Sequence, residues 1–196
     1  MSLLLESIRI EEGKVMNAEY HIERMRRSVA EAKHPTSTSF PGNFIPENLI
    51  PPTGIHKCRV LYNSAIVSVE VAPYIPKKIT TLKVVQAPRP DYSLKYADRS
   101  AINSLYELRG ECDDILIVSD GLVTDTSYCN VAFEKGREWF TPARPILKGT
   151  MRQYLLDNGE IKEKEIPVSE INEYSRVWLF NAMVSHYKLG VEAVVK

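Results

Sequence analysis

The pattern of hydrophobic side chains in the first half of the chain predicts one helix and three main strands. Apolar residues at spacings of three, four and three predict a helix with one buried face, and they are Ile22, Met25, Val29 and Ala32. Asn17 is the candidate N-cap of this helix, and Pro35 is expected to end it. Leu3–Ile10 alternates loosely and predicts a strand that turns at Gly13 into a short return strand.

Two further strands are expected in the first half, His56–Tyr62 and Ala65–Val71, and a proline-rich segment follows them. The two prolines within residues 73–78 are tolerated poorly by a helix and by a central strand. We therefore place a linker at about 73–78. It separates a small N-terminal α/β domain, residues 1–75, from a larger C-terminal domain, residues 79–196.

The second half is expected to alternate strands with short helices, which indicates an α/β chain of the α+β type. Asp120-Gly121 tolerates positive φ angles, so a tight hairpin is expected between Ile115–Val118 and Val123–Phe133. The other expected strands are Ile79–Ala87, Glu138–Thr141, Ile161–Val168, Arg176–Phe180 and 191–195. The expected helices are Ser100–Leu108, Thr150–Asp157 and Ser169–Glu173, with a poorly defined short one near Pro46–Leu49.

Composition and charge exclude several classes of protein. The 196 residues are 44% hydrophobic and 26% charged, with 25 Lys and Arg against 25 Asp and Glu. Such a balanced surface favours neither nucleic acid nor a membrane surface as a partner. No apolar run approaches the roughly 18 residues that span a bilayer, and the first residues lack the basic region of a signal peptide. We therefore expect a cytoplasmic protein.

Cysteine and histidine residues form no pattern of disulfides or metal ligands. Cys58, Cys112 and Cys129 are odd in number and include no Cys-x-x-Cys pair, which is typical of reduced thiols in a cytoplasmic protein. The four histidines are scattered without the spacing of metal ligands. We expect no metal site.

Lys95 is the candidate centre of the chemistry, because a lysine at a strand-to-helix junction can turn its amine into a cavity. It stands in the short loop between the apolar run Leu82–Gln86 and the helix expected from Ser100. A buried amine loses hydration, which lowers its pKa and leaves a neutral amine able to form a Schiff base with an aldehyde or ketone. A solvated surface lysine is the alternative, and the residues downstream favour the catalytic role.

Three features downstream of Lys95 suit an aldehyde cofactor that carries a phosphate. Gly149-Thr150 opens a helix whose free N–H groups can bind phosphate, although Thr150 by itself is equally typical of a simple helix cap. Asp125 lies on an expected buried strand, where a carboxylate needs a partner such as a protonated pyridine nitrogen. Asn181-Ala182 ends a buried strand, and small residues there let the backbone approach a ligand closely.

Several segments together resemble the class IV pyridoxal-phosphate (PLP) enzymes. These fold-type IV proteins include branched-chain and D-amino acid aminotransferases and aminodeoxychorismate lyase. The most specific matches are the hairpin segment 113–133, with Asn130, and Leu147-Lys-Gly-Thr-Met-Arg152. The further matches are Glu6-Ser-Ile-Arg9, His21-Ile-Glu-Arg24-Met, Lys95-Tyr-Ala-Asp-Arg99, Thr141-Pro and Val177-Trp-Leu-Phe-Asn-Ala-Met183. The resemblance implies a two-domain fold like that of D-amino acid aminotransferase, with PLP between the domains.

The resemblance also implies a role for each matching residue. Lys95 would hold PLP as a Schiff base and move a proton at the substrate α-carbon. Arg24 would bind the cofactor phosphate with its guanidinium fork, unlike its neighbours Arg26 and Arg27, which are expected to be solvated. Asp125 would keep the pyridine nitrogen protonated, so that the ring remains an electron sink. The phosphate cradle would be completed by Gly149, Thr150, Asn181 and Ala182, and the ring would be lined by Ser127, Tyr128 and Cys129.

Substrate recognition is less defined than cofactor binding. Arg59 falls where some members of the family bind a substrate carboxylate. Relatives also carry an additional strand pair before the Glu6 segment, which helps to shape their substrate pocket. Asp125 stands where the family has glutamate, and its shorter side chain is expected to make a longer, water-bridged or absent contact with the ring nitrogen.

The motifs favour one activity and leave two alternatives open. Lys95-Tyr-Ala-Asp-Arg99 and Asn181-Ala-Met183 are closer to the lyase pattern than to that of the aminotransferases, which more often carry Ser-Gly-Thr at the second position. We therefore expect a lyase that releases pyruvate and 4-aminobenzoate from 4-amino-4-deoxychorismate, and a homodimer, as in relatives. The alternatives are an aminotransferase of the branched-chain or D-amino acid type and a degenerate homologue without activity.

Overall fold

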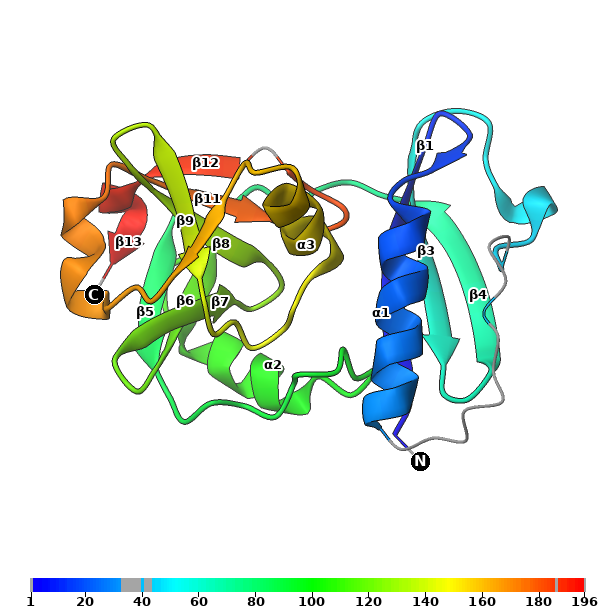
Figure 1. Ribbon diagram of the computed structural model, residues 1–196, viewed down its shortest axis with the longest axis horizontal. Coiled ribbons are helices and arrows are strands. Elements are labelled where there is room, and N and C mark those ends of the chain that lie inside the picture. Colours follow the sequence, from blue (N-terminus) through cyan, green and yellow to red (C-terminus); the bar gives the residue numbers. More distant parts are fainter. Residues whose placement is uncertain (1, 33–39, 41–43, 186, 196) are drawn as a thin grey trace. The chain divides into compact units, whose positions relative to one another are not determined.

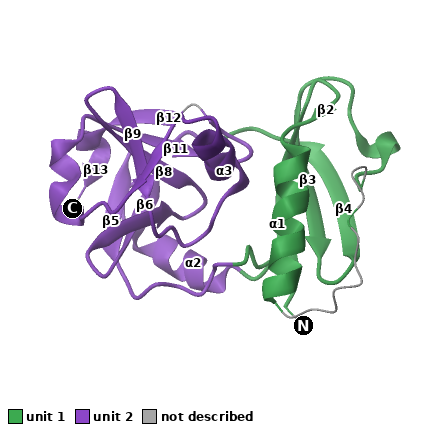
Figure 2. Ribbon diagram, viewed as in Figure 1, with its two compact units in different colours: residues 1–76, 94–98 green, residues 77–93, 99–196 purple. Residues whose placement is uncertain are grey.

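The computed structural model describes all residues except 1, 33–39, 41–43, 186 and 196 (Figure 1). The chain forms two compact units: residues 1–76 with 94–98 make up unit 1, and residues 77–93 with 99–196 make up unit 2 (Figure 2). The segment 94–98 therefore packs with unit 1, although it stands in the sequence between two segments of unit 2. This segment contains Lys95.

Unit 1 is an antiparallel sheet of order β2-β1-β3-β4 with one long helix packed on it (Figure 1). Its elements are β1 (Leu4–Glu11), β2 (Lys14–Val15), α1 (Ala18–Glu31), the 3-10 helix η1 (Glu47–Leu49), β3 (Ile55–Tyr62) and β4 (Ile66–Pro73). The strands and the helix that the apolar periods predict are confirmed. Side chains such as Ile8, Met25 and Val60 fill the space between sheet and helix.

Helix α1 begins where it was expected to begin, but not for the expected reason. Asn17 occupies the N-cap position with φ 50° and ψ 38°, and its side chain makes no capping hydrogen bond. An asparagine tolerates this left-handed backbone better than most residues, so its backbone rather than its side chain suits the position. The helix ends at Glu31, and the expected stop at Pro35 lies outside the described residues.

Unit 2 contains two sheets. The first has the order β13-β5-β6-β7 and consists of β5 (Leu82–Gln86), β6 (Asp114–Ser119), β7 (Leu122–Thr126) and β13 (Val194–Val195). The second has the order β10-β9-β8-β11-β12 and consists of β8 (Asn130–Lys135), β9 (Glu138–Pro142), β10 (Lys162–Lys164), β11 (Arg176–Phe180) and β12 (Tyr187–Gly190). The helices are α2 (Ser100–Tyr106), η2 (Glu107–Arg109), α3 (Thr150–Asp157), η3 (Val168–Glu173) and η4 (Val191–Ala193).

The hairpin at Asp120-Gly121 is confirmed, but the strand expected after it is wrong. The φ angles of these two residues are 53° and 75°, as a two-residue turn requires. The expected strand Val123–Phe133 breaks into β7 and β8, which belong to different sheets. Thr126 causes the break, because its N–H donates to Cys129 O (2.9 Å) and its Oγ1 accepts the N–H of Cys129 (3.0 Å).

Two other expected strands are shorter than their apolar runs. Within the segment 161–168 the strand covers Lys162–Lys164, Pro167 forms an isolated β-bridge with Leu122, and Val168 already starts η3. The tail begins with η4, and only Val194–Val195 pairs with β5.

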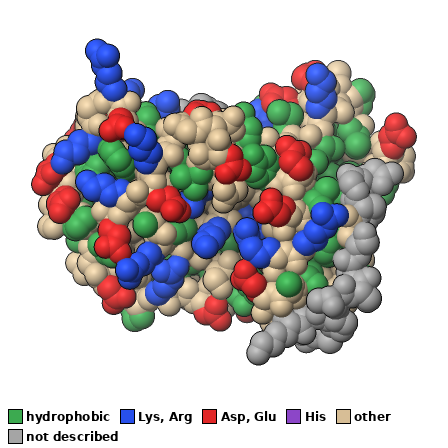
Figure 3. Space-filling view, viewed as in Figure 1, with side chains coloured by type: hydrophobic (Ala, Val, Ile, Leu, Met, Phe, Trp, Pro, Cys, Tyr) green, Lys and Arg blue, Asp and Glu red, His purple; other side chains and the backbone are tan. Residues whose placement is uncertain are grey.

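No helix among the described residues is long and apolar enough to cross a membrane. On the face shown in Figure 3, Lys and Arg side chains are interspersed with Asp and Glu.

Candidate functional site

Lys95 lies beside the first strand of unit 1, and its backbone is tied there. Leu5 N donates to Lys95 O (2.9 Å), and Ala97 N donates to Leu3 O (2.8 Å). Leu4 and Tyr96 form a β-bridge between these two bonds. The residue follows β5 and precedes α2, as expected, and its side chain is half-buried.

A buried charged cluster lies on β1 and α1, close to the point where the Lys95 segment joins β1. Arg24 Nε donates to Glu6 Oε1 (2.8 Å), and Arg24 Nη2 donates to Glu6 Oε2. His21 Nδ1 lies 2.7 Å from the same Oε2. Burial would raise the pKa of Glu6, but the charge of Arg24 and the hydrogen bond from His21 outweigh burial and hold this pKa at about 2. Glu6 therefore stays ionised and fixes the Arg24 guanidinium in one orientation.

His21 leaves one polar atom of this cluster unused. Its Nε2 is buried and has no hydrogen-bond partner among the described residues. Burial lowers the pKa of His21, the charges of Arg24 and Lys95 lower it further, and the contact with Glu6 opposes them. A neutral His21 that donates Nδ1–H to the Glu6 carboxylate presents a lone pair at Nε2. Such an orphaned acceptor in a buried site suits a polar ligand.

Arg59 lies on the other face of the same sheet. In the pairing of β1 with β3, Ser7 stands opposite Arg59 and Glu6 stands opposite Val60. Because side chains alternate between the faces of a strand, Arg59 points to the face opposite Glu6 and α1. The structure thus brings Arg24 to the Glu6 cluster and keeps Arg59 apart from it.

In unit 2, the expected ring-lining residues form the turn between β7 and β8. Ser127, Tyr128 and Cys129 make up this turn, and Asn181 lies beside it at the end of β11, followed by the half-buried Ala182. Asn181 Nδ2 donates to Tyr128 O (3.2 Å) and lies 3.2 Å from Cys129 Sγ. Burial raises the pKa of the Cys129 thiol, so this cysteine stays protonated and serves packing rather than nucleophilic chemistry.

Three residues that support these groups had no role assigned from the sequence. Glu6 and His21 orient Arg24, and Arg99 Nη2 donates to Ser127 O (2.7 Å) and so holds the β7–β8 turn. All three lie in segments that resemble the family. The family resemblance of these segments could have indicated all three residues, but it was used to assign roles only to Arg24 and Lys95.

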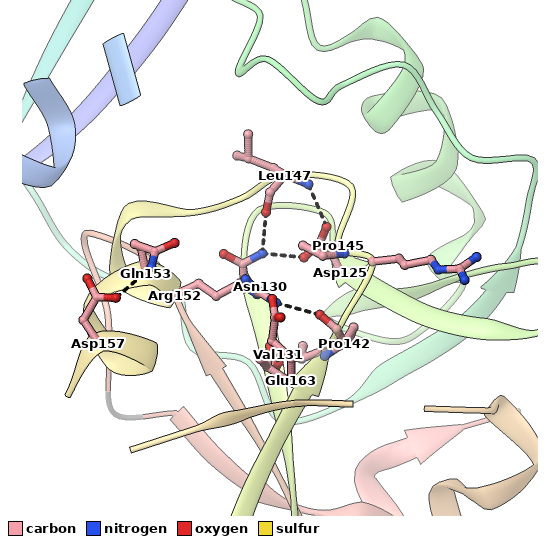
Figure 4. Close-up of polar contacts among 12 residues, drawn as sticks. Asp125, Asn130, Val131, Pro142, Pro145, Leu147, Arg152, Gln153, Asp157 and Glu163 are labelled. Carbon is pink, nitrogen blue, oxygen red and sulfur yellow. Dashed lines mark hydrogen bonds and ion pairs between the residues drawn. The ribbon is translucent and has the colours of Figure 1, made fainter. Parts of the chain in front are cut away.

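Asp125 and Asn130 face each other across the β7–β8 turn, and both contact the segment that leads into α3 (Figure 4). Asn130 Nδ2 donates to Asp125 Oδ1 (2.6 Å) and to Leu147 O (2.8 Å). Asp125 Oδ2 accepts the N–H groups of Ile146 (2.5 Å) and Leu147 (3.1 Å). Burial raises the pKa of Asp125 to about 6, and these hydrogen bonds and the charge of Arg152 limit the rise.

Helix α3 begins with Gly149 at its N-cap and Thr150 as its first residue, so Thr150 is not the cap itself. Thr150 is 4% exposed. A Cβ atom on Gly149 would lie 2.1 Å from Asn130 Oδ1, so only glycine fits beside this amide. The first N–H groups of an α-helix have no partner within the helix and carry partial positive charge, which suits a phosphate.

Each unit, taken by itself, carries groups that suit part of a phosphorylated aldehyde such as PLP. Unit 1 has the half-buried Lys95, a buried guanidinium at Arg24 and the unpaired Nε2 of His21. Unit 2 has the N-terminus of α3 at Thr150 and the buried carboxylate of Asp125. An amine for the aldehyde, cationic donors for the phosphate and polar groups for the ring are what this cofactor requires.

Comparisons with known proteins agree with this chemistry. The family model of amino-transferase class IV matches residues 3–187. An uncharacterized protein of Haemophilus influenzae is 36% identical over 182 residues, which are 92% of this chain and 97% of that protein. A crystal structure of a putative 4-amino-4-deoxychorismate lyase from Haemophilus somnus is 35% identical, with a TM-score of 0.85 over 93% of this chain and 97% of that one. A putative aminodeoxychorismate lyase of Schizosaccharomyces pombe is 27% identical in an alignment of 193 positions, and the match covers 87% of this chain and 82% of that protein.

Proposed function

The chain belongs to the class IV aminotransferase family of PLP-dependent enzymes, and from this membership we propose that it is a lyase acting on 4-amino-4-deoxychorismate. The products are pyruvate and 4-aminobenzoate. The observation that carries the proposal is Lys95 beside the buried Glu6–His21–Arg24 cluster, because an amine and a fixed guanidinium are the groups that hold a phosphorylated aldehyde. The H. somnus and S. pombe proteins, both described as lyases of this kind, support the choice of substrate.

We propose a part of PLP for each of the expected site residues. At the phosphate we place Arg24, Gly149, Thr150, Asn181 and Ala182; along the ring we place Ser127, Tyr128 and Cys129, with Asp125 toward the ring nitrogen. When bound, PLP supplies an electron sink for the bond that is cleaved. Lys95 Nζ would hold the aldehyde and would move the proton at the substrate carbon. Glu6 and His21 act through Arg24, whose charge and orientation they maintain.

The proposal is tested by adding PLP to the purified protein and reducing with borohydride. Wild type is expected to develop a visible absorption band and, after reduction, to carry a pyridoxyl group on the peptide that contains Lys95. Lys95→Ala is expected to lack both signals, whereas Lys135→Ala, which changes an exposed lysine, retains them. A folded wild-type protein that shows neither signal is the result that overturns the proposal and favours the degenerate homologue.

Substrate assays separate the lyase from the aminotransferase. Pyruvate release from 4-amino-4-deoxychorismate without any added keto acid is expected of the lyase. Conversion of bound PLP to its amine form by an amino acid alone would instead show the aminotransferase. We also propose a cytoplasmic homodimer, for which light scattering after size-exclusion chromatography is the direct test.

A further inference from the structure

Asp125 has more hydrogen-bond partners within the chain than a carboxylate that only awaits a ring nitrogen would need. Its Oδ2 accepts two successive backbone N–H groups, those of Ile146 and Leu147, and its Oδ1 accepts Asn130 Nδ2. An ionised carboxylate has about four acceptor positions, so three of them are used by the chain itself. We infer that Asp125 is a positioning residue which, together with Asn130, fixes the segment 146–149 and prepares the N-terminus of α3 for a phosphate.

Leu147 is the residue that this pair fixes most firmly. Its N–H donates to Asp125 Oδ2 and its C=O accepts from Asn130 Nδ2, so its backbone is held at donor and acceptor alike. Asn130 in turn uses both amide hydrogens, one on Asp125 and one on Leu147. Figure 4 shows Asn130 beside Asp125, with dashed lines that join each of these two residues to Leu147 and to one another. The three residues form a closed ring of hydrogen bonds in which each member orients the next.

The same pair also reaches the first position of the helix. Asn130 Oδ1 lies so close to Gly149 that a Cβ there would approach it to 2.1 Å. The N-cap residue of α3 therefore packs directly on the amide that Asp125 orients. Through Asn130, the carboxylate on β7 determines where the free N–H groups of α3 begin.

The preceding part of the loop is held by two arginines. Arg152, from the first turn of α3, donates Nη2 to Pro142 O (2.9 Å) and to Glu163 Oε1 (2.6 Å). Arg89 donates to Arg144 O (3.4 Å) and to Pro145 O. These bonds hold residues 142–145 through their carbonyl oxygens, whereas Ile146 and Leu147 offer N–H groups. Asp125 Oδ2 accepts both of these N–H groups, and its charge makes the bonds stronger than those to a neutral acceptor.

The length of the side chain is consistent with this role. An aspartate keeps its carboxyl group close to β7, where it meets the loop, whereas a glutamate would carry the group one methylene further. A ring nitrogen of PLP could still use the remaining acceptor position on Oδ1. Asp125 therefore has a second role, at the phosphate end of the cofactor. The identification of the anion as the PLP phosphate rests on the proposed function.

Amide hydrogen exchange in the cofactor-free protein tests the inference directly. Asp125→Asn is expected to speed exchange at Ile146 and Leu147 about tenfold or more, because a hydrogen bond to a charged acceptor is lost. Asn130→Ala is expected to speed exchange at Leu147, and it carries the test if Asp125→Asn does not fold. Asp113→Asn is the matched control, because Asp113 Oδ2 likewise accepts two successive backbone N–H groups, those of Thr80 (2.7 Å) and Thr81 (3.2 Å), and it should leave the amides of Ile146 and Leu147 unaffected.

Binding and spectroscopy then distinguish positioning from ring contact. Asp125→Asn and Asn130→Ala are both expected to weaken the binding of inorganic phosphate several-fold, whereas Asp113→Asn is expected to leave it unchanged. The inference is overturned if amide exchange at Ile146 and Leu147 is unchanged in both variants and Asp125→Asn alters only the absorption band of bound PLP. Asp125 would then be a partner of the ring nitrogen and not a positioning residue. If wild type fails to attach PLP but the exchange effect is present, the proposed function is wrong and the inference about the loop stands.

Discussion

Arg24 donates its Nε–H to Glu6 Oε1 over 2.8 Å, and both charged side chains lie in the core of unit 1. Taking two charges out of water is costly, and their mutual attraction compensates only when the geometry is good and further hydrogen bonds are made. Here His21 adds such a bond to the same carboxylate. The Glu6 carboxylate thus has the additional hydrogen bond that a buried ion pair needs.

Glu6→Gln is expected to change how stability depends on pH. The pKa of Glu6 is lowered from its ordinary 4.5 to about 2, so its ionisation stabilises the fold above pH 4.5 and this stabilisation is lost as pH falls toward 2. At about 1.4 kcal/mol per pH unit, the advantage of wild type over Glu6→Gln should shrink by about 3 kcal/mol across this range. Urea unfolding of both proteins at several pH values measures it, and a pH-independent difference contradicts the prediction.

Arg24→Met is expected to destabilise the protein by about 3–5 kcal/mol, because it leaves Glu6 buried and without its cationic partner. Arg26→Met, at an exposed position of the same helix, is the matched control; it removes only the hydrogen bond from Arg26 Nη2 to Phe40 O (3.2 Å) and should cost about 1 kcal/mol. The double variant Glu6→Gln/Arg24→Met should lose less stability than the sum of its single changes. Strict additivity in chemical unfolding would show that the pair does not act as a unit.

Gly149→Ala is expected to be destabilising by about 1–3 kcal/mol, since its new methyl group would meet Asn130 Oδ1. The backbone itself can accept alanine, because φ is −70° and ψ is 150°. In an Asn130→Ala background the same change should therefore be neutral or stabilising by about 0.4–1 kcal/mol, through the lower entropy of the unfolded chain. Thermal unfolding of the four cofactor-free proteins gives the result, and equal costs in both backgrounds would falsify the steric explanation.

Asp125 is expected to make the opposite contribution to the pH profile from Glu6. Burial raises its pKa from the ordinary 3.8 to about 6, so the folded state binds its proton more tightly and stability falls as pH rises from 4 to 6. The stability of wild type relative to Asp125→Asn should decrease by about 3 kcal/mol over that interval and then level off. Unfolding curves of both proteins recorded between pH 4 and 7.5 test this prediction. A stability of wild type relative to Asp125→Asn that rises with pH would contradict it.

Much of the local structure follows from neighbouring residues. The positive φ angles that Asp120-Gly121 tolerates are enough to specify the hairpin between β6 and β7, and helix α3 ends at Asp157 just before Asn158-Gly159, as predicted. Lys95 likewise stands in the loop between β5 and α2 that the apolar pattern indicates. Each of these features depends on residues close together in the chain, whose conformational preferences act without distant partners.

The contact between Asp125 and Asn130 could be decided only by the tertiary structure. The apolar run predicts one continuous strand, in which residues five apart would be roughly 17 Å from each other. The turn closed by Thr126 instead sends β7 and β8 into different sheets and brings Asn130 Nδ2 to 2.6 Å from the Asp125 carboxylate. The chain by itself indicated the family, most of the elements and the candidate lysine. Which buried groups satisfy one another depends on where distant segments such as 146–149 pack, and local sequence preferences carry no information about that packing.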